Sequence, residues 1–221
     1  MESPRKAYRG IGMEGPIATW YARNTKGDVR DQRKVARAVA DRVPPRGKVL
    51  EVAPGPGYLA LEIAKLGDYR IFGLDISRSF VRIATENGRA AGADIDFQLG
   101  DAAHMPFPDD EFDFVVCRAA FKNFSDPVGA LEEIHRVLKP GGRASIYDLR
   151  RNASRDAIAD EVSRMGMSPL NRWVTKATFR FMLLKRAYTD AEISRMCAAT
   201  HFGSGEIADD GIGFELRLVK R

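Results

Sequence analysis

Two acidic residues and a glycine-rich turn form the most chemically informative pattern in this chain. Glu51 lies in the apolar segment 48–52, the turn at residues 53–57 follows it, and Asp75 ends the next apolar segment 24 positions after Glu51. Glycines let a backbone approach a ligand closely, and an acid about 20 residues beyond such a turn can accept both hydroxyls of a ribose. The pattern predicts a nucleoside site at the ends of two strands.

The turn distinguishes between classes of nucleoside ligand. No Gly-Lys-Ser/Thr triplet follows Gly57, which excludes a P-loop for a triphosphate. A dinucleotide site needs bare amides facing a pyrophosphate, and the carboxylate of Glu51 would repel that group. The same carboxylate suits a cationic ligand, so the turn favours S-adenosylmethionine, whose sulfonium and amino groups are positive. The alternative is a tight strand-to-helix connection that binds no ligand.

Three later segments add motifs in a fixed order: LGDAAHMPF at 99–107, FDFVVCR at 112–118 and ALEEIHRVLKPGGR at 130–143. With them the chain resembles the class I S-adenosylmethionine-dependent methyltransferases, in particular the small-molecule group typified by the ubiquinone/menaquinone-biosynthesis C-methyltransferases. The resemblance covers roughly residues 35–150, and RVLKPGG is its most specific part. The family's first turn glycine is Ala53 here, and its methyl group is tolerated if the residue keeps a negative φ.

The resemblance implies S-adenosyl-L-methionine as cofactor and S-adenosyl-L-homocysteine as product. It assigns the methionine amino group to Glu51, the ribose hydroxyls to Asp75, and the adenine ring to Asp101 and the amide of Ala102. The remaining cofactor contacts are expected from the turn backbone, two apolar walls and the end of the fourth strand: Ala53, Pro54, Gly55, Gly57, Ile76, Met105 and Arg118.

Methyl transfer from a sulfonium is an in-line displacement, so alignment and exclusion of water matter most and a general base is optional. The possible bases near strand ends are Asp148, His104, Lys122 and Tyr21. Contacts to the acceptor are expected from Tyr21, Phe121, Asn123 and Arg150. The fourth strand ends in RAAFKNF and not in the Asn/Asp-Pro-Pro-Tyr/Phe loop of enzymes that methylate exocyclic amines, which argues against methylation of nucleobases.

Apolar periodicity predicts alternating strands and helices. Strands are expected at 48–53, 69–75, 95–99, 112–118, 143–149, 203–209 and 212–219, and helices at 31–43, 57–66, 78–91, 127–138 and 190–200. Such alternation predicts an α/β fold with a doubly wound, mostly parallel seven-stranded sheet. The resemblance makes this a Rossmann-like class I methyltransferase fold with a helical lid and one antiparallel strand in the last pair.

We predict one domain over residues 1–221. It divides into an N-terminal lid at 1–30, a cofactor-binding core at 31–149, a lid insertion at 150–188, and the last helix and strand pair at 189–221. The two lid segments exceed the minimal fold and are expected to stand over the carboxyl ends of the strands. Within the insertion, basic residues interleave an apolar stripe of Trp173, Ala177, Phe181, Leu184 and Tyr188. This stripe either packs on its own domain or contacts lipid.

Charge is distributed unevenly along the chain. Residues 1–48 hold 12 Lys/Arg against 5 Asp/Glu, residues 49–138 hold 8 against 15, and residues 139–221 hold 15 against 10. The basic flanks fit nucleic acid, an anionic substrate, or plain solvated helix faces. Cys117 and Cys197 are the only cysteines, so a disulfide framework and a structural zinc site are not expected, and we predict no metal. The absence of a long apolar run and the polar first 15 residues predict a cytoplasmic protein.

These observations favour methyl transfer to a small acceptor that is aromatic or lipid-like, and the basic flanks are compatible with an anionic one. An RNA methyltransferase is the second reading, although no RNA-binding domain accompanies the core. A protein that only binds S-adenosylmethionine, as a sensor or structural ligand, is the third. The oligomeric state stays open between monomer and homodimer.

Overall fold

A twisted seven-stranded sheet organises the part of the chain that the structure describes. This structure is a computed structural model, and it describes residues 8–9, 12–25, 29–154 and 184–221. The strands are β1 (Lys48–Val52), β2 (Arg70–Asp75), β3 (Ile95–Leu99), β4 (Phe112–Arg118), β5 (Leu138–Leu149), β6 (Glu206–Asp210) and β7 (Gly213–Val219). Their order in the sheet is β3-β2-β1-β4-β5-β7-β6. Strand β7 alone runs antiparallel to its neighbours in this sheet, as the sequence predicts.

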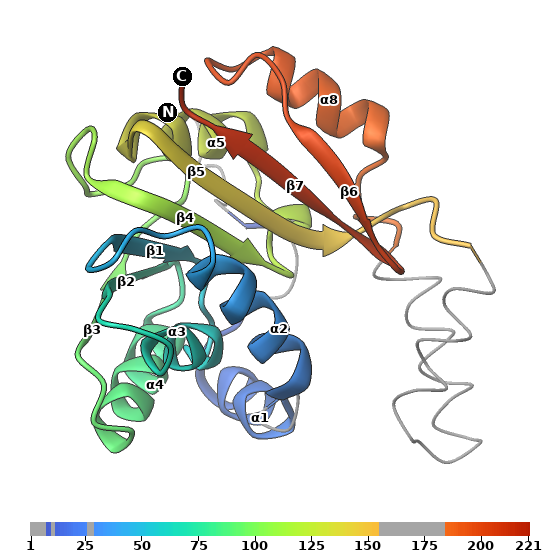
Figure 1. The fold of residues 1–221 in the computed structure, drawn as a ribbon. Helices are drawn as coiled ribbons and strands as arrows, with labels where there is room; N and C mark the ends of the chain where they lie inside the picture. The colour runs from blue at the N-terminus through green and yellow to red at the C-terminus, as the bar shows by residue number, and fades with distance from the viewer. Residues whose placement is uncertain (1–7, 10–11, 26–28, 155–183) are drawn as a thin grey trace, which may run out of the picture.

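Helices cover both faces of the sheet (Figure 1). The described helices are α1 (Gly15–Thr25), α2 (Val29–Ala40), α3 (Tyr58–Ala64), α4 (Arg78–Ala90), the short 3₁₀ helix η1 (Phe121–Asn123), α5 (Pro127–Val137) and α8 (Asp190–Ala198). One buried apolar cluster joins α2, α3 and α4 to the sheet, and a second joins α5 and α8 to it. Two packed layers of helix around a parallel sheet are the doubly wound arrangement that the sequence predicts.

Local sequence signals explain where several helices begin. The Ser77 side chain accepts a hydrogen bond from the amide of Phe80 at the start of α4. Asp126 caps α5 in the same way and is followed by proline at the first helical position. Thr189 and Glu192 form a reciprocal capping box at α8. Such caps satisfy amide groups that have no partner inside the helix.

The structure departs from the sequence-based expectations in two elements. Strand β5 begins at Leu138 and not at residue 143, because Gly141 and Gly142 exchange backbone hydrogen bonds with Lys220 and extend the pairing toward β7. The predicted helical lid had no helix bounds within residues 1–30; the structure places α1 there, and it forms because Ala18 and Ala22 pack against Phe80 of α4. The stripe proposed within the lid insertion falls mainly on 155–183, outside the described residues.

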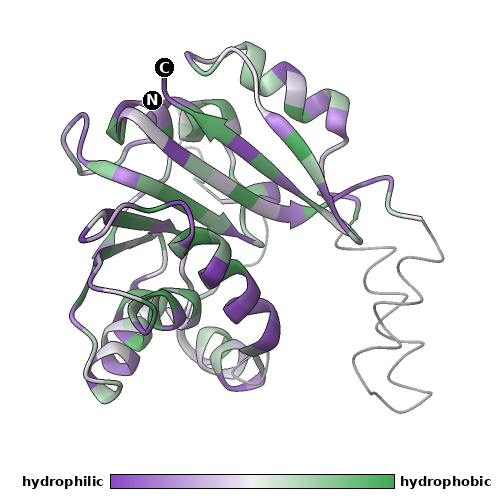
Figure 2. Ribbon diagram, viewed as in Figure 1, coloured by the Kyte–Doolittle hydropathy of each residue, from purple (hydrophilic) through white to green (hydrophobic). Residues whose placement is uncertain are grey.

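Hydropathy follows burial. Figure 2 shows green, hydrophobic segments in the central strands, whereas α2 is largely purple along its exposed side. None of the helices in the described ranges combines the length and apolar character needed to cross a bilayer.

Candidate functional site

The carboxyl ends of β1 and β2 lie side by side, because the strands pair in parallel with Val52 opposite Leu74. From β1 the chain continues to β2 and β3 on one side of the sheet, whereas β4 and β5 lie on the other side. Open α/β sheets bind ligands in the crevice beyond the strand ends at such a reversal of strand order. We therefore place the candidate site at the carboxyl ends of β1, β2 and β4.

The turn between β1 and α3 adopts left-handed backbone at three alternate positions. The φ angles are 56° at Ala53, 55° at Gly55 and 79° at Gly57. The condition of a negative φ at Ala53 is therefore not met, and the residue adopts a conformation that costs an L-residue about 1–2 kcal/mol. At Gly57 an added Cβ would lie 2.8 Å from the ring of Phe97, whereas at Gly55 it would meet no atom within 4 Å. Gly57 therefore permits close packing on Phe97, and Gly55 leaves the backbone open toward the crevice.

Glu51 is a buried acid without a complete set of partners. Its residue is 3% exposed, and one carboxylate oxygen, Oε2, accepts no hydrogen bond from any described residue. Burial raises the pKa of Glu51 to about 8, although a backbone hydrogen bond from Ala60 and the positive charge of Arg118 oppose the shift. A buried, unpartnered carboxylate is unfavourable in itself. The donor set that would satisfy it is a cation with N–H groups, which fits the amino group of S-adenosylmethionine.

Asp75 is equally buried but is held by the backbone. Its Oδ2 accepts from the amide of Gly55 at 3.0 Å and its Oδ1 from the amide of Ser77 at 2.9 Å. Burial raises the pKa of Asp75 to about 6, against the effect of these hydrogen bonds. Each carboxylate oxygen keeps a second lone pair, so the side chain can still accept from ribose hydroxyls. Asp75 therefore also fixes the glycine turn against the end of β2.

The residues expected at the adenine end lie after β2 and β3. Ile76 is 41% exposed, and so is Leu99 at 42%, a residue that the sequence analysis did not select. Two exposed apolar side chains at neighbouring strand ends provide flat surface for a ring. Asp101 accepts a hydrogen bond from the amide of Ala103, next to the expected contact at Ala102. Met105 is 5% exposed and belongs to the core, which limits the area it can offer to a ligand.

Arg118 ends β4 and brings positive charge to the site. Its guanidinium lies 3.7 Å from the carboxylate of Asp31 on α2. The same side chain is close enough to Glu51 to lower the pKa of that carboxyl. The sequence analysis expected Arg118 to contact the cofactor, and the structure adds the electrostatic effect of its side chain on Glu51.

Two of the possible general bases neutralise each other. Lys122 Nζ lies 2.7 Å from Asp148 Oδ1, and both side chains are buried. Asp148 also accepts from the amides of Lys122 and Leu149, and Lys122 also donates to the carbonyl of Ala119. These contacts occupy both oxygens of Asp148 and fix η1 against β5. The arrangement favours a structural role for the pair.

The other two possible bases differ in exposure. The side chain of His104 is 84% exposed and lies 3.9 Å from Asp101. Tyr21 is half-buried on α1 and packs edge to face on Phe80, with ring centroids 5.7 Å apart. Tyr21 is therefore the better placed of the two for contact with a bound molecule.

The structure corrects the expected acceptor contact at Phe121. That side chain is 0% exposed and packs on Phe124 and Tyr188, with ring centroids 5.6 and 5.7 Å away, so it belongs to the core. Asn123 is half-buried, and its carbonyl accepts from the amide of Arg9.

Arg150, another expected acceptor contact, is engaged in ion pairs. Its guanidinium lies 3.2 Å from both Asp190 and Asp209, and these contacts join the end of β5 to α8 and β6. The Arg150 side chain therefore has a structural role.

Tyr8 lies near the candidate site and was not selected by the sequence analysis. It pairs with Phe124 in an isolated antiparallel bridge, and its hydroxyl lies within the electrostatic field of Asp75 and Asp148. No local motif surrounds Tyr8, so only tertiary structure could reveal this position.

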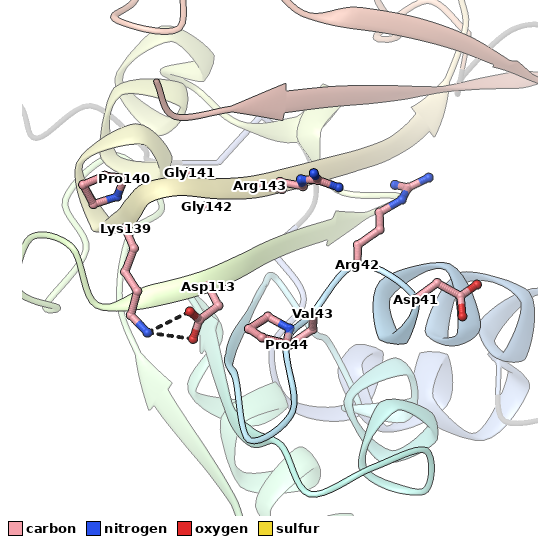
Figure 3. Close-up of a pocket in the computed structure, with 10 residues that line it drawn as sticks. All are labelled: Asp41, Arg42, Val43, Pro44, Asp113, Lys139, Pro140, Gly141, Gly142 and Arg143. Atoms are coloured by element: carbon pink, nitrogen blue, oxygen red, sulfur yellow. Dashed lines mark hydrogen bonds and ion pairs between the residues drawn. The ribbon is translucent and has the colours of Figure 1, made fainter.

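A pocket of about 470 Å³ lies at the opposite end of the strands, beside the amino ends of β4 and β5 (Figure 3). Asp113 near the start of β4 and Lys139 at the start of β5 contribute to its wall, and the lysine ammonium lies 2.8 and 2.7 Å from the two carboxylate oxygens. Because this pocket faces the amino ends of the strands, it is separate from the crevice at Glu51 and Asp75. Within the described residues, no group of three or more His, Cys, Asp or Glu side chains is arranged to hold a metal ion.

Comparison with known proteins agrees with this geometry. Residues 50–146 match the family model described as a methyltransferase domain. A relative from Synechococcus elongatus, named 2-phytyl-1,4-naphtoquinone methyltransferase, is 35% identical over 137 residues, which are 60% of this chain and 57% of the relative. A demethylmenaquinone methyltransferase from Deinococcus radiodurans is 37% identical over 126 residues, covering 57% and 52% of the two chains. The chain thus spans about half the length of the curated relatives it matches.

The matched region, residues 50–146, is thus similar to a methyltransferase domain. Solved structures show the same fold. A Methanococcus maripaludis protein titled a putative S-adenosyl-L-methionine-dependent methyltransferase superposes with a TM-score of 0.74 at 23% identity, covering 100% of this chain and 97% of the other. An Aquifex aeolicus methyltransferase gives 0.70 at 19% identity, covering 92% and 97%. In this chain the buried acids Glu51 and Asp75 and the left-handed turn lie at the point where the strand order of that fold reverses.

Proposed function

We propose that this chain transfers a methyl group from S-adenosylmethionine to a small acceptor. The observation that carries the proposal is Glu51, a fully buried carboxylate with an unpartnered oxygen beside a turn whose backbone is open at Gly55. Such a group is stabilised when a cation binds to it. The donor, when bound, supplies a methyl group activated by the positive charge on its sulfur.

The residues of the site then bind, orient and exclude water. Glu51 would hold the amino end of the ligand, and Asp75 would hold the ribose, while Ile76 and Leu99 shield the ring from solvent. Since displacement at a methyl carbon requires an in-line approach, the fixed spacing between these groups supplies alignment, which is the largest contribution a protein can make to such a reaction. The buried pair of Lys122 and Asp148 keeps the loop after β4 in place.

We further propose that the N-terminal segment closes over the site. Its α1 packs on α4 through Ala18 and Ala22, and the hydroxyl of Tyr58 donates to the carbonyl of Ala22 at 2.8 Å. Trp20, on the outer side of α1, is 65% exposed. The helix is therefore anchored next to the β1–α3 turn, and Trp20 provides a fluorescence probe for ligand binding.

For the acceptor we propose a reduced quinone or a related aromatic compound. The names of the two relatives above concern naphthoquinone and menaquinone substrates, and this chain matches 57% and 52% of their lengths. The decisive experiment is incubation with methyl-labelled S-adenosylmethionine and chemically reduced 1,4-naphthoquinone, followed by mass spectrometry of the acceptor. Addition of one methyl group is the expected result.

Two other outcomes would redirect the assignment. Labelling of RNA and not of the quinol would support the RNA methyltransferase reading. Tight binding of S-adenosylmethionine with no transfer to any offered acceptor would support a sensor or structural role.

A further inference from the structure

The N-terminal segment is fixed across the loop that follows β4. Tyr8 forms an antiparallel bridge with Phe124, and the amide of Arg9 donates to the carbonyl of Asn123 at 2.7 Å. The Arg9 guanidinium donates to the carbonyl of Ser125 at 3.2 Å and to the hydroxyl of Tyr188 at 3.4 Å. None of these contacts uses the Tyr8 hydroxyl, so the backbone position of Tyr8 does not depend on that group.

A second anchor lies on the other side of β1. The Ser77 hydroxyl donates to the carbonyl of Met13 at 2.5 Å, and the Glu14 carboxylate accepts from the amides of Arg78 and Ser79. Ser77 to Ser79 follow directly on β2, whereas Phe124 follows β4, and β1 lies between those two strands. The two anchors therefore stand on opposite sides of the glycine turn.

The Tyr8 side chain is next to the crevice, because the backbone of Tyr8 pairs with Phe124 in the loop that follows β4. It is half-buried, and the carboxylates of Asp75 at the end of β2 and Asp148 near the end of β5 both act on it. Because β1 and β4 occupy the sheet between β2 and β5, a group close to both acids stands over the ends of the two central strands. That is where the acceptor must approach the methyl group.

The Tyr8 side chain stays a hydrogen-bond donor at neutral pH. Burial raises its pKa above the ordinary value, Arg186 lowers it, and the nearby Tyr21, Asp75 and Asp148 raise it further. The Arg186 guanidinium is held over the segment by a 3.5 Å hydrogen bond to the carbonyl of Arg9. A phenol O–H and a guanidinium thus lie close together at the mouth of the site, and this pair suits an oxyanion.

We propose that Tyr8 and Arg186 form a subsite for an oxyanion on the acceptor, that is, for a phenolate or an enolate. This inference rests on the proposed methyl transfer. The acceptor anion donates an electron pair to the methyl carbon, and the carbon–sulfur bond breaks with its electron pair left on sulfur. The proton that the acceptor loses goes to water, either from its hydroxyl before transfer or from the alkylated ring carbon afterwards. By lowering the pKa of the acceptor, the subsite makes a general base unnecessary, in agreement with the full engagement of Asp148 by Lys122.

The subsite can be tested without turnover. 4-Nitrophenol absorbs visible light only as the phenolate, so its pKa can be titrated in protein saturated with S-adenosylhomocysteine. The bound probe should have a lower pKa than the free probe, and Tyr8→Phe and Arg186→Gln should each return it toward the free value. Tyr69→Phe is the matched control, because Tyr69 precedes the amino end of β2 and its hydroxyl contacts the carbonyl of Ala40. An unshifted probe pKa in the wild type, or a shift that both site variants retain, would overturn the proposal.

Measurements of methyl transfer then distinguish the subsite proposal from the proposed function. With a reduced naphthoquinone, Tyr8→Phe should lower kcat/KM about 10- to 100-fold, the loss expected for one hydrogen bond to a charged group. Its affinity for S-adenosylhomocysteine should not change, and its activity should recover at a pH where the free acceptor ionises. If the probe pKa is shifted but the wild-type protein transfers no methyl group, the subsite proposal stands and the proposed function is wrong. Equal pH profiles for the wild type and Tyr8→Phe would reject the subsite alone.

Discussion

Two buried glutamates on the same sheet have opposite surroundings. Glu215 on β7 accepts hydrogen bonds from Arg42 at 2.5 Å, Ser145 at 2.9 Å, Tyr147 at 2.8 Å and Arg217 at 2.8 and 2.9 Å. Burial alone would raise the pKa of Glu215, but these hydrogen bonds lower it to about 2. Glu51 on β1 has an unpartnered oxygen, and burial raises its pKa to about 8.

Under the proposed function, this difference distinguishes an acid that stabilises the fold, Glu215, from one that binds a ligand, Glu51. The hydrogen-bond donors to Glu215 come from the chain itself, whereas Glu51 Oε2 has no donor among the described residues and, in our proposal, is satisfied by a bound cation. Changes at the first acid should therefore affect stability, and changes at the second should affect binding.

The largest effect is expected from Glu215→Gln. The substitution leaves Arg42 and Arg217 without their carboxylate partner, and removal of one member of a buried charged network costs about 3–5 kcal/mol. Equilibrium unfolding in urea should show a loss toward the lower end of that range, because Arg217 is partly exposed. S-Adenosylhomocysteine affinity, measured on the folded fraction, should be unchanged. If the variant is as stable as the wild type, Glu215 does not stabilise the fold and its contrast with Glu51 is wrong.

Acid titration adds a check on the same residue. The folded-state pKa of Glu215 is depressed, so its stabilising contribution is present above the unfolded-state value of about 4.3 and is lost as the pH falls toward 2. The difference in unfolding free energy between wild type and Glu215→Gln should shrink over that window.

Asp148 lies near the site but should behave like Glu215. Its oxygens are occupied by Lys122 and by two backbone amides. Asp148→Asn should lower the free energy of unfolding by about 3 kcal/mol, since it leaves the buried ammonium of Lys122 unpaired. The methyl-transfer rate per folded molecule should fall less than tenfold. A loss of two or more orders of magnitude with normal S-adenosylhomocysteine binding would instead identify Asp148 as a general base.

Glu51→Gln should show the reverse pattern. Loss of a charge-assisted hydrogen bond is expected to weaken S-adenosylmethionine binding by about 1.5–3 kcal/mol. The unfolding free energy at pH 8 should not decrease, because the amide removes an unfavourable buried charge. Calorimetric titration and urea unfolding measure the two quantities. Glu86→Gln, at an exposed ion pair with Arg82, is the matched control and should change neither. Reduced stability with intact binding would place Glu51 in the same class as Glu215.

The smallest effect is expected from Ala53→Gly. Glycine relieves the left-handed strain at φ 56° but gains conformational freedom in the unfolded chain. The net result should be a stabilisation of about 0.5–1 kcal/mol in urea unfolding. Affinity for S-adenosylhomocysteine should be retained. Destabilisation of the variant would mean that the Ala53 methyl group makes packing contacts that outweigh the backbone strain.

Local patterns predicted most of the fold and suggested the candidate site. Apolar segments that end in an acid or a glycine turn identified the strands carrying Glu51 and Asp75, because those signals lie within a few residues of one another. Interactions between distant positions could not be predicted this way: Arg42 and Glu215 are 173 residues apart, and no pattern connects them. Phe121 was assigned to the acceptor because an aromatic residue after a strand fits either a site or a core, and only packing distinguishes the two.

The central claim is that Glu51 is reserved for a cationic ligand, and proton release on binding tests it most directly. In the protein without ligand, Glu51 has a pKa of about 8 and is mostly protonated at pH 6.5. A bound cation would favour the ionised form of its carboxyl group. Titration calorimetry with S-adenosylmethionine at pH 6.5, in buffers of different ionisation enthalpy, should detect release approaching one proton per ligand. Affinity should rise by up to about tenfold per pH unit and level off above pH 8. In Glu51→Gln this release and this rise should be absent. Binding without proton release in the wild type, or equal release in the two proteins, would contradict the account.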